Sequence, residues 1–232
     1  MPPDDIVSRI LYEDNHLIIV NKMAGEVVQG DKTGDFPLLE KVRDYIKETY
    51  QKPNNVFCGL VHRIDRPVSG VTIFAKTSKA LSRMNELIKN RKVKKIYWAV
   101  VEKALVPEEG KLEGYLKKNE KLNKSYHSFE LKEGYKKAEL LYKTLSHSDR
   151  YVLLEIELIT GRHHQIRCQL SANGAIIKGD LKYGAKRSNP DGSIALHAKK
   201  IEFEHPVSHL IIKVEADPIL INNASFKIFK KK

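Results

Sequence analysis

The chain has 232 residues, and a hydrophobic share of 41% is enough for the core of one large domain or two small ones. Its 41 lysines and arginines exceed its 29 acids, and the net charge of +12 favours a polyanionic partner, most simply nucleic acid. Two cysteines exclude a disulfide framework, and no apolar run approaches the roughly 20 residues that span a bilayer.

The basic residues are clustered, which favours RNA or DNA over the alternative of a merely soluble basic protein. The clusters lie at 89–95, 117–124, 178–187 and 227–232. The first ten residues, MPPDDIVSRI, are acidic and lack an apolar segment, so no signal peptide is expected. The sequence therefore predicts a cytoplasmic protein with no membrane segment.

The first half of the chain predicts strands and two helices. Pro37 begins a helix with an apolar stripe, and Thr77 or Ser78 caps a second one. The predicted strands are 7–12, 16–22, 56–65, 71–76 and 94–102. Because the last of these is apolar on both faces, we expect it to be central in a sheet.

Strands dominate the second half. They are predicted at 111–116, 125–131, 138–145, 151–159, 193–203 and 209–215. Thr160 is expected to cap a short helix that ends near Gly174. Residues 218–229 are expected to form a closing helix. Runs of strands with few helices predict an α+β fold with a largely antiparallel sheet. No linker divides the chain, so residues 1–232 are expected to form one catalytic domain with two lobes.

The segment LVHRIDRPVSG, at 60–70, begins as a buried strand and then crowds ionisable groups together. On a strand, Arg63 and Asp65 would share one face, and a carboxylate beside a guanidinium has its charged form favoured. Ser69 and Gly70 are expected to form a turn. A structural ion pair is the commoner explanation of such neighbours, so the segment alone does not establish a site.

The segment ITGRHHQIRCQLSANG, at 159–174, would expose the amides of Gly161 and Arg162 at a helix start. Adjacent helical histidines such as His163 and His164 diverge and do not chelate together, so no metal site is expected. The segment KKIYWAVVE, at 94–102, places Tyr97 on one strand face. Tyr97 is either an ordinary core residue or a platform on which a base stacks.

In this order, these segments resemble those of the RluA-type pseudouridine synthases, over nearly the whole chain. HRIDRPVSG resembles the family's H-R-L-D-R-x-x-S-G, and KIYWAVV its K-x-Y-x-A-x-V. The third segment, LITGRHHQIRCQLSANGAIIKGDLKYG, resembles T-G-R-x-H-Q-I-R followed by G-x-x-I-x-G-D-x-x-Y-G. ALHAKKIEFEHP resembles L-H-A-x-x-x-x-F-x-H-P. Four such motifs in order are very specific.

The resemblance implies a pseudouridine synthase fold and the isomerisation of uridine in ribosomal or transfer RNA, by a monomer without cofactor or metal. Asp65 would be the catalytic aspartate, Arg167 its basic partner and Tyr97 the aromatic that stacks on the flipped uracil. Arg63 would enter the base stack and help to evert the nucleotide. Leu196 would form an apolar wall of the base pocket, and Arg162 would contact a phosphate.

Many relatives carry an N-terminal S4 RNA-binding domain. None is expected here, so RNA affinity would come from the catalytic domain.

The class of protein and the chemical step of Asp65 stay open on the sequence. The alternatives to a synthase are an RNA glycosidase or nuclease and a non-catalytic RNA-binding module. Glycoside hydrolysis ordinarily needs two carboxylates, and Asp65 is the one acid to which the resemblance assigns a chemical role. Whether Asp65 would attack C1′, attack the uracil ring or deprotonate C2′ is not readable from sequence.

Overall fold

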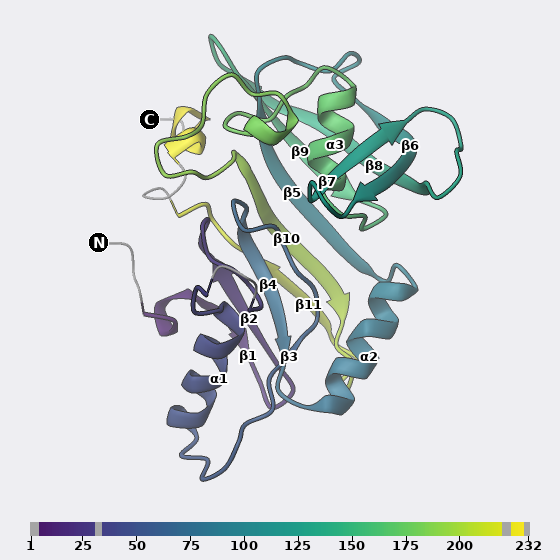
Figure 1. The fold of residues 1–232 in the computed structure, drawn as a ribbon. Helices are drawn as coiled ribbons and strands as arrows, with labels where there is room; N and C mark the ends of the chain where they lie inside the picture. Colours follow the sequence, from purple (N-terminus) through teal and green to yellow (C-terminus); the bar gives the residue numbers. More distant parts are fainter. Residues whose placement is uncertain (1–4, 31–33, 220–223, 230–232) are drawn as a thin grey trace. The chain divides into compact units, whose positions relative to one another are not determined.

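The computed structural model describes residues 5–30, 34–219 and 224–229 (Figure 1). The chain divides into two compact units, Met1–Val93 with Ala198–Asn222 and Lys94–His197 with Asn223–Lys232. We call these the first and the second unit. The end of the predicted basic tail, at 230–232, lies outside the described residues, as do residues 220–223 within the predicted closing helix.

The first unit is a sheet with the strand order β1-β2-β4-β10, in which β11 pairs with β10 and β3 with β4. Every pairing recorded for β1–β2, β2–β4, β3–β4 and β10–β11 is antiparallel. The strands and helices of this unit are β1 Ile10–Glu13, β2 Leu17–Lys22, β3 Gly59–Leu60, β4 Ser69–Ala75, β10 Leu196–Glu204, β11 Ile211–Glu215, α1 Leu38–Thr49 and α2 Ser78–Lys89, with a short 3₁₀ turn at Val7–Arg9. The first two residues of β10, Leu196 and His197, belong to the second unit.

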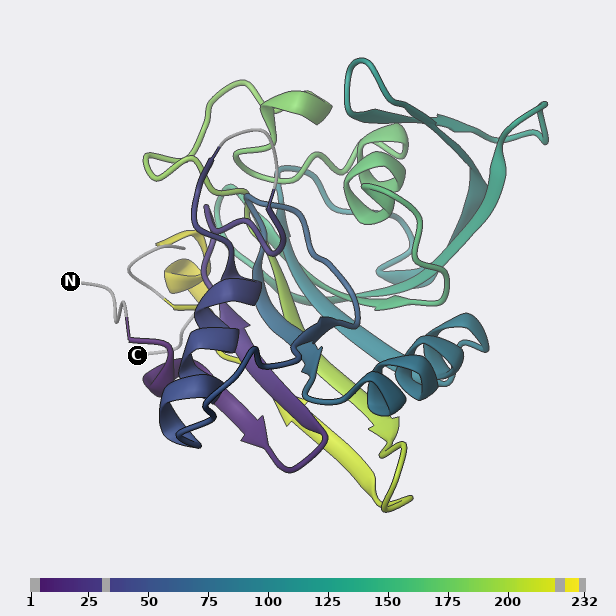
Figure 2. The same cartoon turned by 60° about the horizontal axis from the view of Figure 1, so that its bottom comes forward.

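Strand β2 is buried along its whole length because both of its faces pack in apolar clusters, and α1 lies against one of them (Figure 2). Ile18 and Val20 pack in one apolar cluster with residues of α1, whereas Leu17 and Ile19 pack in another with residues of α2. Successive strand residues point to opposite faces, which accounts for this division. Thr77 caps α2 as predicted, since its Oγ1 accepts a hydrogen bond of 3.1 Å from the amide of Ala80.

The second unit is an antiparallel sheet with the order β5-β9-β8-β6-β7. One helix, α3, contacts β6 and β7, and its Cys168 is buried with Leu116, Ala138 and Tyr183. Burial raises the pKa of the Cys168 thiol to about 11, as is typical of an unreactive core cysteine. The elements are β5 Val93–Val101, β6 Glu109–Asn119, β7 Lys124–Ser128, β8 Lys136–His147, β9 Val152–Leu158 and α3 Gln165–Ala172, with 3₁₀ turns at Leu181–Tyr183 and Ala224–Phe229.

The α+β class and the largely antiparallel sheet are therefore confirmed, but several predicted elements differ. Residues 56–65 were predicted as one strand, and only Gly59–Leu60 pairs with β4. Ser69 and Gly70 were predicted as a turn, and they begin β4 instead. At Gly70, where φ is +117°, an added Cβ would lie 2.3 Å from the carbonyl oxygen of Ala198, so glycine allows a close backbone approach.

The helix expected from Thr160 begins later, at Gln165, after a turn that ends with His164 in the left-handed region at φ 52°. The side chains of Thr160 and Gln165 hydrogen-bond with each other and fix that turn instead of capping a helix. Of the predicted helix at 218–229, the structure describes a 3₁₀ turn at Ala224–Phe229. Within the described ranges, no helix is long and apolar enough to cross a membrane.

Candidate active site

Asp65 lies in a loop of the first unit, residues 61–68, which has no regular secondary structure. The strand-face argument for Arg63 and Asp65 is therefore wrong, because these residues are not in a strand. Arg63 is exposed and Asp65 half-buried. The loop is closed by a turn in which the amide of Val68 donates to the carbonyl of Asp65 at 3.0 Å, and the amide of Gly25 donates to the carbonyl of Arg66 at 2.8 Å.

The amine of Lys22, at the end of β2, organises this loop from inside. Lys22 is fully buried, and its Nζ donates to the carbonyls of Met23 at 2.9 Å, Val68 at 2.7 Å and Arg66 at 3.1 Å, with Asp65 O at 3.4 Å. Carbonyls that converge on one amine fix the backbone at Asp65 and in the residues that follow it.

Burial lowers the pKa of Lys22 to about 7, and the charges of Glu26 and Asp65 oppose this shift. A lysine with so low a pKa exchanges its proton near neutrality while it keeps at least two N–H donors for the loop carbonyls. No role was predicted for Lys22. The one available signal was a lysine that ends the buried run LIIVNK, where a charge is costly unless it is hydrogen-bonded.

Arg167, on α3 of the second unit, is buried and forms a two-pronged ion pair with Asp180. Its Nε lies 2.7 Å from Asp180 Oδ2 and its Nη2 2.8 Å from Oδ1. The guanidinium also lies over the ring of Tyr183, 5.0 Å from the ring centroid. Asp180 was not predicted, although it stands in the quoted segment KGDLKYG, because a separation of thirteen residues across a turn carries no pairing signal.

Tyr183 connects this pair to the turn before α3. Its hydroxyl accepts a hydrogen bond from the amide of Ser125 at 2.8 Å and lies 3.0 Å from Nδ1 of His164. Burial, with the charge of Arg167, lowers the pKa of His164 to about 2, so the ring is neutral. The tyrosine proton can therefore be donated to Nδ1, which holds the ring of His164 at the start of α3.

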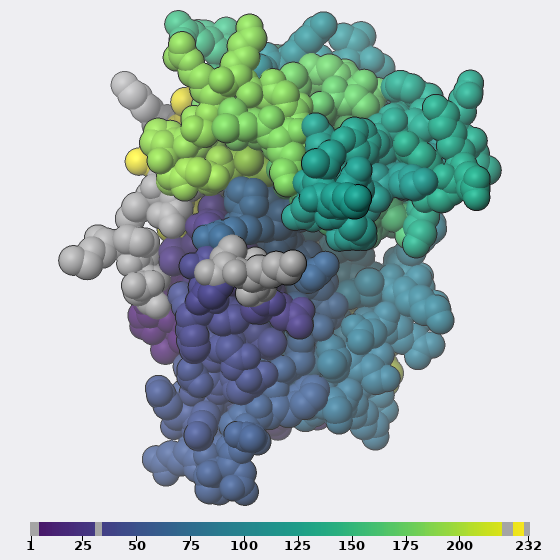
Figure 3. All heavy atoms as spheres, viewed as in Figure 1, coloured from purple at the N-terminus to yellow at the C-terminus, as the bar shows by residue number. Residues whose placement is uncertain are grey.

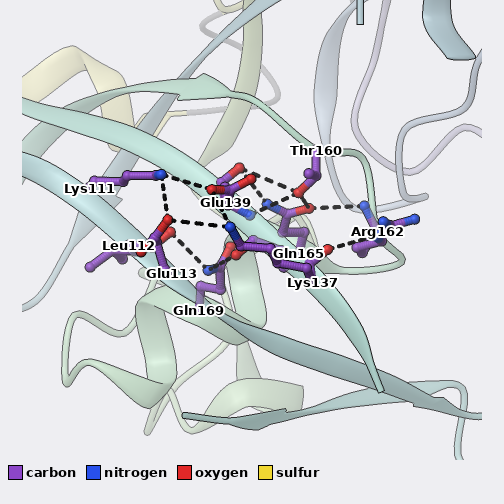
Figure 4. Close-up of polar contacts among 10 residues, drawn as sticks. Lys111, Leu112, Glu113, Lys137, Glu139, Thr160, Arg162, Gln165 and Gln169 are labelled. Atoms are coloured by element: carbon purple, nitrogen blue, oxygen red, sulfur yellow. Dashed lines mark hydrogen bonds and ion pairs between the residues drawn. The ribbon is translucent and has the colours of Figure 1, made fainter. Parts of the chain in front are cut away.

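The turn that carries Arg162 is anchored on one carbonyl of β8 (Figure 4). The carbonyl of Glu139 accepts hydrogen bonds from the amides of Ile159 and Thr160 and from Nε2 of Gln165, at 3.0–3.2 Å. The predicted exposure of the Arg162 amide is wrong, since this amide donates to Gln165 Oε1 at 3.0 Å. The side chain is also held, because Arg162 Nε donates to the carbonyl of Lys137 at 3.0 Å.

The remaining predicted residues are buried. Tyr97 lies on β5 with 8% of its surface exposed, and Leu196 begins β10 with 4% exposed. Asp65 and Arg63 thus belong to the first unit, whereas Tyr97, Arg167, Arg162 and Leu196 belong to the second. Among the residues that the structure describes, no group of three or more His, Cys, Asp or Glu could hold a metal ion.

The histidines before α3 also differ from expectation. They were predicted to diverge on a helix, but His163 and His164 precede it and their rings stack with centroids 3.8 Å apart. His163 contacts Ser125 Oγ through Nδ1 at 2.9 Å and Asn123 Oδ1 through Nε2 at 3.1 Å. His163 thus fixes the turn to β7 through Ser125, whereas the ring of His164 is held by Tyr183.

Comparison with known proteins gives consistent matches. A family model described as RNA pseudouridylate synthase matches residues 16–172. Ribosomal large subunit pseudouridine synthase C of Buchnera aphidicola is 33% identical over 219 residues, 91% of this chain and 68% of that protein. Ribosomal large subunit pseudouridine synthase D of Neisseria meningitidis is 33% identical over 231 residues, 92% of this chain and 59% of that protein.

The fold is also similar to that of a solved structure. A structure titled human RNA pseudouridylate synthase domain containing 4 superposes with a TM-score of 0.81 at 22% identity, covering 96% of this chain and 93% of that one. This confirms the predicted pseudouridine synthase fold. The chain spans about 59 to 68% of the length of the three curated relatives matched first. The matched segment includes the loop of Asp65, the strand of Tyr97 and the turn before Arg167, and the chain belongs to the RNA pseudouridylate synthase family.

Proposed function

We propose that this protein isomerises uridine in RNA to pseudouridine and that Asp65 is the group that acts on the nucleotide. The observation that carries the proposal is the loop of Asp65, which lies within the family match and is held by the buried amine of Lys22. Reacting groups need such rigid support, because small displacements cost much of the rate.

The reaction breaks the bond between N1 of uracil and C1′ of the ribose and joins C1′ to C5 of the same uracil. One hydrogen leaves C5 and one is gained at N1, so no redox or group-carrying cofactor is required. A carboxylate can act as a nucleophile at C1′ or at the uracil ring, or as a base at C2′. Arg167 is proposed as the basic partner that favours the ionised form of Asp65.

The target base must first leave its stack, at a cost of a few kcal/mol. Arg63 is exposed on the same loop as Asp65 and is proposed to fill the space that the base vacates. Tyr97 is proposed to stack on the flipped uracil, with Leu196 as an apolar wall of the base pocket. Arg162, whose guanidinium is oriented through its Nε, is proposed to contact phosphate.

Large-subunit ribosomal RNA is the proposed substrate, because relatives are named for that activity, and transfer RNA is the alternative. Pseudouridine-specific labelling of cellular RNA, compared with and without the protein, would identify the modified position. Light scattering would test the expectation of a monomer.

The decisive variant is Asp65→Asn, which keeps the size of the side chain and removes its charge. Tritium release from [5-³H]uridine RNA should vanish, while RNA binding should persist because phosphate contacts come from other residues. Thermal stability should change little, because Arg167 keeps the counter-charge of Asp180. Asp149→Asn, in an exposed loop of the second unit, is the matched control and should keep full activity.

Turnover by a well-folded Asp65→Asn protein would refute the catalytic assignment. If the unaltered protein binds RNA tightly but releases no tritium from any ribosomal or transfer RNA, the chain is a binding module on a synthase fold. An early loss of the folded state in Asp65→Asn, with the folded remainder still active, would make Asp65 a structural residue.

A further inference from the structure

Two adjacent lysines follow Val93 at the start of β5, and their surroundings differ. Lys94 is exposed, and its Nζ lies 2.9 Å from Glu157 Oε2 on the neighbouring strand β9. Lys95 is half-buried, and within the described ranges no hydrogen bond or ion pair of its amine is recorded. Burial alone lowers the pKa of Lys95, with no acid near enough to oppose it. An ammonium that is partly desolvated and lacks a counter-charge is a costly arrangement that an anionic ligand would relieve.

The amine of Lys95 lies beside the turn that precedes α3. A Cβ added to Gly161 would be 3.4 Å from Lys95 Nζ, so the amine stands directly over that glycine. Lys95 also shares a strand face with Tyr97, two residues along β5. The lysine was the unexplained first residue of the KIYWAVV segment.

The turn contributes further donors. The amide of the exposed Gly161 has no hydrogen-bond acceptor recorded in the part of the chain that the structure describes. The next residue, Arg162, has its Nε bound to the carbonyl of Lys137, and no partner of its two Nη atoms is recorded within the same ranges. The Glu139 carbonyl holds the turn in place, so these donors are set before any ligand arrives (Figure 4).

We propose that the Lys95 amine, the Gly161 amide and the Arg162 guanidinium form a phosphate-binding site that holds one backbone phosphodiester of the RNA substrate. Its location on the Tyr97 face of β5 fits a phosphate close to the base that Tyr97 would stack on. A compact ammonium supplies the point charge, and the planar guanidinium supplies directed donors. The inference rests on the proposed function, because it takes RNA as the ligand.

The test measures RNA binding without turnover, on a ribosomal RNA fragment, as a function of salt concentration. Lys95→Gln should lower the slope of log K against log salt by about 0.7, the value for one single-strand phosphate contact. This corresponds to a loss of about fivefold in affinity at 0.1 M salt that disappears towards 1 M. The matched control is Lys94→Gln, which removes an exposed charge of the same sign from the neighbouring position and should leave the slope unchanged.

Gly161→Ala provides a second variant that keeps every charge. The new methyl group makes an ordinary contact with Lys95 and should not disturb folding, but it would prevent a phosphate from approaching the amide. It should therefore weaken RNA binding without moving the melting temperature. Bound RNA should also protect Lys95, and not Lys94, from an amine-reactive reagent.

Equal slopes for Lys95→Gln and Lys94→Gln, or full affinity of Gly161→Ala, would overturn the phosphate site while leaving the proposed isomerisation intact. Conversely, absence of tritium release from the unaltered protein, with Lys95-dependent binding retained, would refute the isomerisation and not the site.

Discussion

The buried pair of Arg167 and Asp180 allows a prediction of both stability and activity. Both side chains are at most 6% exposed, and their two contacts are 2.7 and 2.8 Å long. Asp180→Asn keeps the shape, but it removes the counter-charge and turns an amide N–H₂ group towards the guanidinium. Breaking a buried pair in this way costs about 3–5 kcal/mol. For a chain of this size, about 2–4 °C per kcal/mol gives a fall in melting temperature of about 6–20 °C.

Activity should fall further than the loss of folded protein explains, because a displaced Arg167 cannot serve as the proposed partner of Asp65. Calorimetry and tritium release, measured on one preparation below its melting temperature, separate the two effects. The double variant Arg167→Met with Asp180→Leu is the control, since an apolar pair of similar volume should recover most of the stability and none of the activity. An Asp180→Asn protein with the same melting temperature as the unaltered protein would refute this reasoning.

Three further predictions concern the Asp65 loop and the RNA. Lys22→Met should lower the free energy of unfolding by about 1–3 kcal/mol, because loop carbonyls lose their donor, and should reduce kcat. The pKa of Lys22 is about 7 in the folded protein and higher in the unfolded chain, so above pH 7 the unfolded chain binds more protons and the unaltered protein gains stability as pH rises. Urea titrations should therefore show that the difference in unfolding free energy between the unaltered protein and Lys22→Met widens towards pH 10. A difference in unfolding free energy that narrows towards pH 10 would contradict the lowering of the Lys22 pKa by burial. Arg63→Ala should leave folding intact and reduce tritium release from a structured RNA more than from an unstructured oligonucleotide, whereas equal losses would give Arg63 another role. RNA affinity of the unaltered protein should fall with salt by about 0.7–0.9 in log K per phosphate contact, and a flat response would exclude backbone-driven binding.

The parts predicted well from sequence are those whose signal is local. Strand β2 and strand β5 follow from continuous apolar runs, and α2 from its cap at Thr77. Asp65 was found through a motif, since nothing in its own spacing distinguished it from a structural acid.

The parts that failed depend on partners distant in sequence. The residues around Asp65 alternate like a strand, yet the amine of Lys22, more than forty positions earlier, draws their carbonyls into a loop. The turn before α3 is likewise set by Glu139 on β8. Its carbonyl accepts from the amide of Thr160 and its amide donates to Thr160 Oγ1, so the Thr160 hydroxyl does not cap a helix. Short-range periodicity carries no information about either contact.

The close approach at Gly70 bears on what a sequence motif diagnoses. In HRIDRPVSG, the aspartate is proposed to serve chemistry, whereas the final glycine admits the backbone of Ala198 at a distance that any side chain would forbid. Selection on the fold alone would therefore preserve the glycine in a descendant that had lost catalysis. When such descendants are sought among relatives, the informative comparison is between these two positions of one motif: a retained glycine with a replaced aspartate would indicate an inherited scaffold put to another use.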